Sequence, residues 1–248
     1  MRFGNRANYW IVEDGHFDVS RGAEQTATIE LEGEEKQTLS FDPKRSAFVV
    51  VDMQNYFCSP LLGRPEGALK LVPAIVSAVA SCRALGIMVV WVNWGHRPGI
   101  DNVPPSLLYA WQRSGRPGIG QPLPDDLGLT LVKGSWSAAL IDELMEVYEE
   151  TDPWVDKYRI SGFPGTTLDA VLRANGIQTL FHAGVNTDQC VMDTIHDAAF
   201  LGYDNVLLQD CTATTSPPYV LEGSLYNMRS KAFTSTSVSL KEAALLNI

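Results

Sequence analysis

The chain has 248 residues, 45% hydrophobic and 19% charged, enough for one large domain or two small ones with a proper core. Its 29 acidic residues outnumber 19 basic ones, and the formal net charge of -10 argues against a nucleic-acid partner, because polyanion binding needs a basic face. The sequence lacks an uncharged apolar run of the roughly 20 residues that a membrane span needs, and its start lacks the apolar stretch of a signal peptide. We therefore expect a cytoplasmic protein without nucleic-acid or membrane partners.

Residues 1–40 differ in pattern from the rest of the chain. Residues 9–13 and 16–19 flank an Asp-Gly pair, which is typical of a β-hairpin closed by a two-residue turn. Residues 26–31 alternate as a further strand does, and a charged loop follows them. The segment is too short to fold alone, so we expect an arm that packs on its own domain or on a neighbouring subunit.

From residue 46 onward, short apolar runs alternate with amphipathic stretches. This alternation is typical of a parallel sheet whose two faces are both covered by helices. It predicts a doubly wound α/β domain over residues 41–248, a three-layer α/β/α arrangement. The expected strands are 47–51, 87–92, 154–157, 177–183, 205–209 and 233–237, and the expected helices are 68–85, 137–147, 166–175, 189–201 and 219–230.

Residues 95–130 interrupt the alternation with many prolines and glycines, among which lie Tyr109 and Trp111. A long insertion of this kind in a compact domain is usually a functional lid or a subunit contact. A tolerated surface loop is the alternative, and the two aromatic residues favour a lid.

Three reactive side chains are expected beyond the carboxyl ends of strands, where open parallel sheets bind their ligands. Asp52 follows the strand 47–51, Lys157 ends the strand 154–157, and Cys190 lies shortly after the strand 177–183. Each residue also has a purely structural interpretation. Asp52 could cap a following turn, Lys157 could be a solvated charge, and Cys190 could be a core residue. An acid, a base and a thiol at the same edge favour a functional site.

Cys190 has the most informative surroundings. It is predicted at the start of the helix 189–201, where the positive end of the helix dipole favours a thiolate, as a nearby Lys157 would. Asp52 could accept the thiol proton and pass it to a leaving nitrogen. Backbone N–H groups at a helix start are natural donors to an oxyanion. Together these features indicate acyl transfer by a cysteine nucleophile.

The other cysteines, Cys58, Cys82 and Cys211, are interpreted as small buried hydrophobes. None of the four forms a Cys-x-x-Cys pair, and no histidine lies at zinc-finger spacing from any of them. A structural zinc is therefore not expected.

The chain resembles the isochorismatase-like cysteine hydrolases over roughly residues 41–240. The resemblance rests on three motifs in the right order: residues 50–55 with Phe57, residues 156–163 around Lys157, and residues 184–191 followed by Asp197. It implies a six-stranded parallel sheet and subunits that assemble as a homodimer or homotetramer.

The same resemblance implies a catalytic triad of Asp52, Lys157 and Cys190. It also implies a cis peptide between Val185 and Asn186, and an oxyanion hole made by the backbone N–H groups of Asn186 and Cys190. No cofactor is needed for this chemistry.

Differences from the family's subgroups narrow the chemistry further. Isochorismatases proper lack the nucleophilic cysteine, so the presence of Cys190 implies hydrolysis of a C–N bond. Nicotinamidases carry a metal site of one aspartate and two histidines after the second strand, whereas residues 93–98 hold only His96. Neither a metal nor nicotinamide is therefore expected. The chain is more similar to ureidoacrylate, biuret and N-carbamoylsarcosine amidohydrolases, although Tyr158 stands where ureidoacrylate-type members usually have proline.

The expected activity is hydrolysis of a small amide, ureido or carbamoyl compound through a thioester, with release of ammonia or an amine. Arg97, Arg113 and Arg159 leave room for a substrate that bears a carboxylate. The expected substrate-binding residues are Asn93, Trp94, His96, Tyr109, Trp111 and Phe163, with Trp136 and Phe163 equally suited to the core.

Three alternatives stay open. Cys190 could pair with His182 or His196 in the manner of a papain-like protease. The fold could serve a non-catalytic binding or scaffold protein, although no Gly-x-Gly-x-x-Gly follows the first strand to suggest a dinucleotide. A hydrolase of the same family could also act on a different small substrate.

Overall fold

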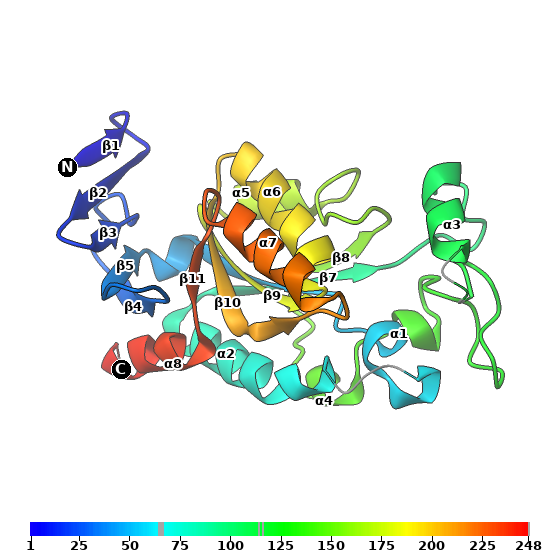
Figure 1. Cartoon of the computed structure of the whole chain (residues 1–248). Helices are drawn as coiled ribbons and strands as arrows, with labels where there is room; N and C mark the ends of the chain where they lie inside the picture. The colour runs from blue at the N-terminus through cyan, green and yellow to red at the C-terminus, as the bar shows by residue number, and fades with distance from the viewer. Residues whose placement is uncertain (64–66, 114, 116, 248) are drawn as a thin grey trace.

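The computed structural model describes residues 1–63, 67–113, 115 and 117–247, so a few residues of the predicted domain and insertion lie outside the described residues. Its central sheet has six strands, all parallel, in the order β11-β10-β9-β6-β7-β8 (Figure 1). The strands are β6 (Ser46–Val51), β7 (Met88–Trp94), β8 (Trp154–Lys157), β9 (Thr179–Val185), β10 (Asp204–Ala213) and β11 (Phe233–Ser235). The predicted α/β fold with a six-stranded parallel sheet is confirmed.

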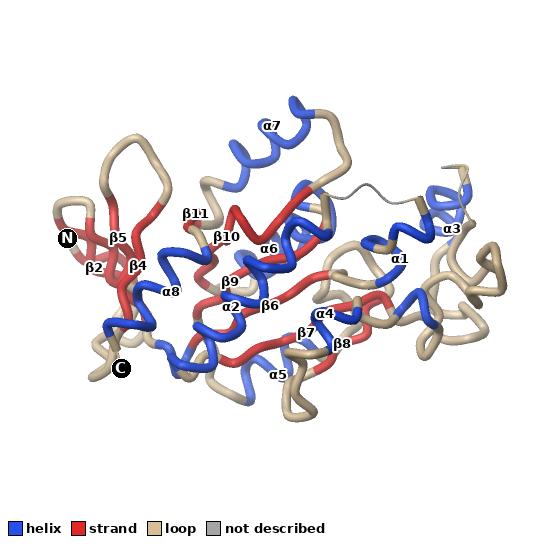
Figure 2. Tube along the Cα trace, turned by 90° about the horizontal axis from the view of Figure 1, so that it is seen from below, coloured by secondary structure: helices blue, strands red, loops and turns tan. Residues whose placement is uncertain are grey.

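Helices cover both faces of this sheet, as Figures 1 and 2 show. One face carries α2 (Val72–Leu85), α4 (Asp142–Met145) and α8 (Ser237–Leu246), and the other carries α5 (Leu168–Ala174), α6 (Met192–Phe200) and α7 (Pro218–Met228). Two further helices, α1 (Asn55–Cys58) and α3 (Pro105–Gln112), lie beyond the carboxyl ends of the strands. None of the helices among the described residues combines the length and the hydropathy that a membrane crossing needs.

The strand sequences explain why the sheet is sandwiched. Every residue of β6 is buried, and alternate residues contribute to two different cores. Phe48 and Trp91 belong to the core under α2 and α8, whereas Val49 and Trp94 belong to the core under α5 and α6. Because side chains alternate along a strand, this division fixes the face to which each strand-end residue belongs.

The N-terminal segment forms a second sheet in the order β1-β2-β3-β5-β4. Its strands are β1 (Arg2–Gly4), β2 (Tyr9–Glu13), β3 (His16–Asp18), β4 (Ala27–Leu31) and β5 (Gln37–Phe41). The predicted hairpin is present as β2 and β3, which pair antiparallel across Asp14 and Gly15. The sheet is attached to the domain by a buried ion pair of 2.7 Å between Arg21 and Asp204 and by a hydrogen bond from the N–H of Glu32 to the carbonyl of Thr234.

The predicted helix over residues 137–147 is wrong. Only Asp142–Met145 is α-helical, after a single turn at Trp136–Ala138. The cause is a tertiary contact: Gln54 Nε2 donates to the carbonyl of Ala138 at 2.7 Å, and Gln54 forms an antiparallel bridge with Leu140. These backbone groups bond to the segment after β6 and are therefore not available to a helix.

Among the described residues, five strands and α-helices were not predicted: β1, β5, α1, α3 and α8. α3 lies inside the insertion 95–130, which was expected to be a loop. The N-terminus of α8 is held from a distance, because the Asp210 carboxylate accepts hydrogen bonds from the backbone N–H (2.8 Å) and hydroxyl of Ser237. The strand β11 therefore ends at Ser235, two residues earlier than the sequence predicted.

Candidate active site

The candidate site lies where the order of the strands reverses. The chain passes from β6 to β7 and β8 on one side, and then continues with β9, β10 and β11 on the other side. Sheets of this kind bind ligands at the carboxyl edge, where loops leave neighbouring strands in opposite directions. Asp52 directly follows β6, and Cys190 lies five residues after the end of β9, so both residues stand at this edge.

Lys157 reaches Asp52 from two strands away. It is the last residue of β8, and its Nζ lies 3.0 Å from Asp52 Oδ2, with both side chains fully buried. On the way it crosses Trp94, whose ring centroid is 3.6 Å from Nζ. Nζ also donates to the backbone carbonyls of Arg159 (3.2 Å) and Ile160 (2.9 Å). A carboxylate, a ring and two carbonyls thus compensate the burial of this ammonium group.

Cys190 is held in one wide turn before α6. Residues 187–191 form this turn, in which the N–H of Val191 donates to the carbonyl of Asn186 at 3.2 Å. Such five-residue turns are rare and frequently occur at functional sites. The peptide bond between Val185 and Asn186 is cis, at the position that the family resemblance implies.

A glycine allows β6 and β9 to approach each other just before the site. Gly184 has φ of +106°, and a β-carbon there would lie 1.9 Å from the carbonyl oxygen of Val51. Any other residue would push apart the two strands that carry Asp52 and Cys190. Asp52 itself has φ of +55°, in the left-handed region.

Burial is the largest influence on the pKa of the thiol. The pKa of Cys190 is raised to about 12 mainly by burial, with the Lys157 cation opposing the change and the Asp52 carboxylate adding to it. Burial also raises the pKa of Asp52, and Lys157 again opposes the change. The direction of this shift is opposite to that expected for a thiolate, because burial outweighs the Lys157 cation. The Asp52 carboxylate lies close enough to shift the thiol's pKa, as a base for that proton would have to.

Residues 46–239 match the isochorismatase domain family. The chain belongs to this family of isochorismatase-like hydrolases. Its fold is similar to that of a cysteine hydrolase from Pseudomonas syringae pv. phaseolicola 1448A, with a TM-score of 0.71 and 23% identity over 88% of this chain and 98% of that one.

Two further solved structures resemble this isochorismatase-like protein at higher identity. N-carbamoylsarcosine amidase from Thermoplasma acidophilum has a TM-score of 0.59 and 29% identity over 78% of this chain and 96% of its own. Pyrazinamidase of Pyrococcus horikoshii, in complex with zinc, has a TM-score of 0.61 and 25% identity over 77% of this chain and 99% of its own.

Two residues of this isochorismatase-like site were not among the expected functional residues. Thr194 is fully buried; its hydroxyl donates to the carbonyl of Cys190 at 2.6 Å and accepts from the N–H of Gly162 at 3.0 Å. It therefore joins the turn that holds Cys190 to the loop that follows Lys157. A threonine inside a predicted helix carries no signal of such a role in the sequence.

Gln54 is the second of these residues. Its side-chain amide donates to the carbonyl of Trp94 at 2.8 Å and accepts from the N–H of Trp94 at 2.9 Å. The glutamine thus fixes the end of β7 against the segment that follows Asp52. Its place in the first motif was the available signal, but the partner of the amide was not visible in the sequence.

The expected substrate-binding residues separate into two groups. Trp94 and His96 stack at 5.3 Å, and Trp111 of α3 contacts Trp94 edge-on at 5.3 Å, so these three meet beside Lys157. Tyr109 is 67% exposed on α3, and Phe163 packs in the core against Tyr203 at 6.0 Å. By the alternation of β7, Asn93 belongs to the face of Trp91, opposite to Trp94.

The two alternative histidine partners lie on different elements, β9 and α6. His182 is buried within β9, where its Nε2 lies 2.9 Å from Asn205 Oδ1. His196 lies on α6 and lines a pocket with Phe200. Cys58, Cys82 and Cys211 are fully buried, as expected of structural cysteines. Within the described ranges, no group of three or more His, Cys, Asp or Glu side chains is arranged to hold a metal ion.

Proposed function

We propose that this protein is a cysteine-dependent amidohydrolase, which cleaves the C–N bond of a small amide, ureido or carbamoyl compound through a thioester. The observation that carries the proposal is the meeting of Asp52, Lys157 and Cys190 at the carboxyl edge of the sheet, as a thiol beside an ion-paired carboxylate. The likeness to an N-carbamoylsarcosine amidase at 29% identity supports a C–N bond as the target.

In the first half of the proposed reaction, the Cys190 thiol loses its proton to Asp52 as Sγ attacks the carbonyl carbon. Backbone N–H groups of Asn186 and Cys190 donate to the resulting oxyanion. Asp52 then passes the proton to the nitrogen, the C–N bond breaks, and ammonia or an amine leaves. The acyl group stays on Sγ as a thioester.

In the second half, Asp52 accepts a proton from a water molecule that attacks the thioester carbonyl. The C–S bond breaks, the acid product is released, and the proton returns to Sγ. Lys157 keeps Asp52 oriented and stabilises its negative charge, which would otherwise be costly in a fully buried position. The proton shuttles within one buried pair, so a high resting pKa of the thiol is compatible with turnover.

The proposal is tested by measuring ammonia release from a panel of simple amides, ureido acids, biuret and nicotinamide. We expect at least one ureido or carbamoyl compound to be hydrolysed, and Cys190→Ser to abolish the reaction. Cys82→Ala, which alters a buried cysteine of α2, is the matched control and should retain activity. Absence of ammonia across the panel with an intact Cys190 thiol would overturn the assignment.

Thr194 provides a finer prediction. Thr194→Val keeps the shape but removes the hydroxyl that holds the carbonyl of Cys190 and the N–H of Gly162. Because small displacements of a nucleophile are costly, we expect kcat to fall roughly 10- to 100-fold with little change in KM. Steady-state kinetics and chemical denaturation would separate this effect from a loss of stability of about 1–2 kcal/mol.

Thr166→Val is the control for that prediction. The Thr166 hydroxyl donates to the carbonyl of Gly162 at 2.6 Å, in the same loop, and among the described residues it makes no hydrogen bond to the turn of Cys190. The Thr166→Val variant should lose a similar amount of stability and keep kcat within about threefold of the wild-type value. Equal kcat losses in the two variants would mean that Thr194 acts only through the stability of the loop.

A further inference from the structure

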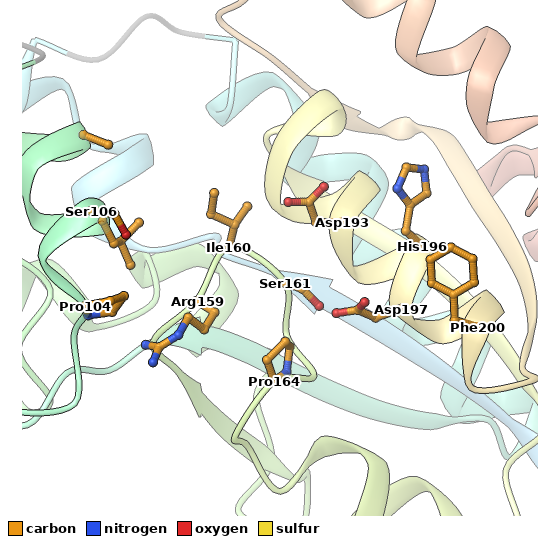
Figure 3. A pocket seen from close by; sticks show the side chains of 12 residues that line it. Pro104, Ser106, Arg159, Ile160, Ser161, Pro164, Asp193, His196, Asp197 and Phe200 are labelled. Carbon is orange, nitrogen blue, oxygen red and sulfur yellow. The ribbon is translucent and has the colours of Figure 1, made fainter.

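A pocket of about 380 Å³ lies at the edge strand β8, on the face of the sheet that carries α4. It is separate from the pocket of about 640 Å³ between α3 and α6, which Figure 3 shows with the charged side chains of Arg159, Asp193 and Asp197. Among the described residues, the two pockets share no lining residue, and none of the three proposed catalytic residues lines the smaller one. Its size is within the usual range for small-molecule sites.

Two aromatic rings form one wall of the smaller pocket, and hydrogen bonds hold one of them in place. Trp154 and Tyr148 meet edge to face, with ring centroids 5.9 Å apart. The Trp154 indole N–H donates to Asp156 Oδ1 at 3.0 Å, and Asp156 Oδ2 accepts from Lys133 Nζ at 2.5 Å. Gly95 makes room for this carboxylate, since a β-carbon there would lie 2.4 Å from Oδ1. The aromatic wall is therefore preformed, and the two charges beside it neutralise each other.

Another wall of the pocket contains backbone whose carbonyl groups are already hydrogen-bonded. The carbonyls of Trp94 and Ala138 accept from the Gln54 side-chain amide at 2.8 and 2.7 Å. The carbonyl of Ala139 accepts from the N–H of Asn55 at 2.9 Å. The small side chains at positions 138 and 139 leave the space beside them open. Because these carbonyls are satisfied, this wall mainly offers van der Waals contact, which suits a flat apolar ring.

Ser135 brings a hydrogen-bond acceptor to the pocket. The neighbouring hydroxyl of Ser137 donates to the carbonyl of Leu129 and accepts from the N–H of Leu131, each at 2.8 Å. A hydroxyl has one proton, so the 3.0 Å hydrogen bond between the two serine hydroxyls must be donated by Ser135. No donor among the described residues hydrogen-bonds to Ser135 Oγ in return, so its lone pairs remain available to a ligand.

We propose that this pocket is a second binding site, for a neutral, flat aromatic molecule of one or two fused rings that carries an N–H or O–H donor. The ligand's ring contacts Trp154 and Tyr148, and its donor bonds to Ser135 Oγ. An anion is not expected, because Lys133, the cation that lines the pocket, is paired with Asp156. The site lies beyond the proposed hydrolysis and does not depend on it.

The test measures the binding of indole and of benzofuran to the whole protein by equilibrium dialysis, with the free compound quantified by chromatography. The two probes have nearly the same size and flatness, but only indole carries an N–H donor. We expect both to bind, and indole to bind roughly 3- to 10-fold more tightly, as one neutral hydrogen bond provides. In Ser135→Ala the two dissociation constants should become equal within about twofold.

Ala139→Leu should fill the pocket and weaken the binding of both probes by at least about 10-fold. Ala174→Leu is the matched control, because it makes the same change at an exposed position of α5 that does not line the pocket. Alkylation of Cys190 is the control for binding at the catalytic residues, because Cys190 does not line this pocket either. Both controls should leave the dissociation constants within about twofold of those of the wild type.

No binding of either probe at about 1 mM, an indole preference that persists in Ser135→Ala, or unchanged binding in a folded Ala139→Leu would each overturn the site. Loss of binding on alkylation of Cys190 would place the ring at the catalytic residues and would also overturn it. Ser135→Ala removes only a hydroxyl at a half-buried position, so the test stands even if Ala139→Leu does not fold. Because no step measures ammonia release, failure of this site and failure of the proposed hydrolysis are distinguishable.

Discussion

Asp52→Asn should lower kcat/KM for hydrolysis by roughly 10²- to 10⁴-fold, the range for the loss of a general base. The asparagine amide keeps the size of the carboxylate but cannot accept the thiol proton or return it to the leaving nitrogen. The measurement is steady-state ammonia release on the best substrate of the panel. Wild-type rates in Asp52→Asn would contradict the proposed proton transfer.

The rate at which iodoacetamide alkylates Cys190 distinguishes two roles of Asp52: a base that accepts the thiol proton, or only a nearby negative charge. The negative charge of Asp52 raises the pKa of the thiol, so its removal alone would lower that pKa and speed up alkylation. If Asp52 instead accepts the proton as Sγ attacks, Asp52→Asn should slow alkylation at pH 7 by about 10-fold or more. Peptide mapping would follow Cys190 against Cys58, which is fully buried and serves as the internal control. Faster alkylation in the variant would exclude Asp52 as the base.

Lys157→Met should reduce the free energy of unfolding by about 3–5 kcal/mol at pH 7, because it leaves Asp52 buried without its cation. Lys133→Met is the control: Lys133 pairs with Asp156 but is 68% exposed, so its loss should cost less than about 1 kcal/mol. Urea denaturation of both variants tests the difference. Similar small losses in the two variants would mean that the buried pair contributes little to stability.

The pH dependence of Lys157→Met has a definite sign. Burial raises the pKa of Asp52, and Lys157 lowers it, so the variant's Asp52 has a still higher pKa in the folded state. A carboxyl group with a raised folded pKa keeps its proton while the unfolded chain releases it, so folding loses stability as pH rises above about 4. The difference in the free energy of unfolding between Lys157→Met and the wild type should therefore shrink as the pH falls from 7 toward 4. At pH 7, the double variant Lys157→Met with Asp52→Asn should recover much of the lost stability.

The activity of a second lysine variant, Lys157→Ala, tests whether Cys190 works with Asp52 and Lys157 or with His182. Lys157→Ala should lose activity, whereas His182→Ala should keep the chemical step, because His182 contacts Asn205 within β9. Full activity in Lys157→Ala combined with no activity in a folded His182→Ala would make the proposed triad wrong.

Local sequence patterns were sufficient to place the main elements. The apolar run before Asp52 and the run that ends at Lys157 predicted β6 within one residue and β8 without error, because continuous β-branched and aromatic stretches mark buried parallel strands. Parallel topology then brings the ends of such strands to one edge, so Asp52, Lys157 and Cys190 could be placed together before any contact was known.

Long-range contacts decided what those patterns could not. The extended course of residues 139–141 depends on the Gln54 side chain, and the position of Cys190 depends on Thr194; neither contact follows from periodicity. Likewise, the insertion 95–130 contains a helix whose Trp111 packs on Trp94, a contact between residues 17 positions apart in the chain.

The sequence by itself determined the sheet, the order of the motifs and an excess of acid that argues against polyanion partners. The tertiary structure decided the electrostatic environment of the site. A sequence names an acid, a lysine and a thiol, but only folding shows that all three are desolvated together, that burial raises the pKa of the thiol, and that Arg159 is left without an acidic partner among the described residues. The reason is that desolvation and ion pairing depend on distances in the fold, which residue types and their spacing do not contain.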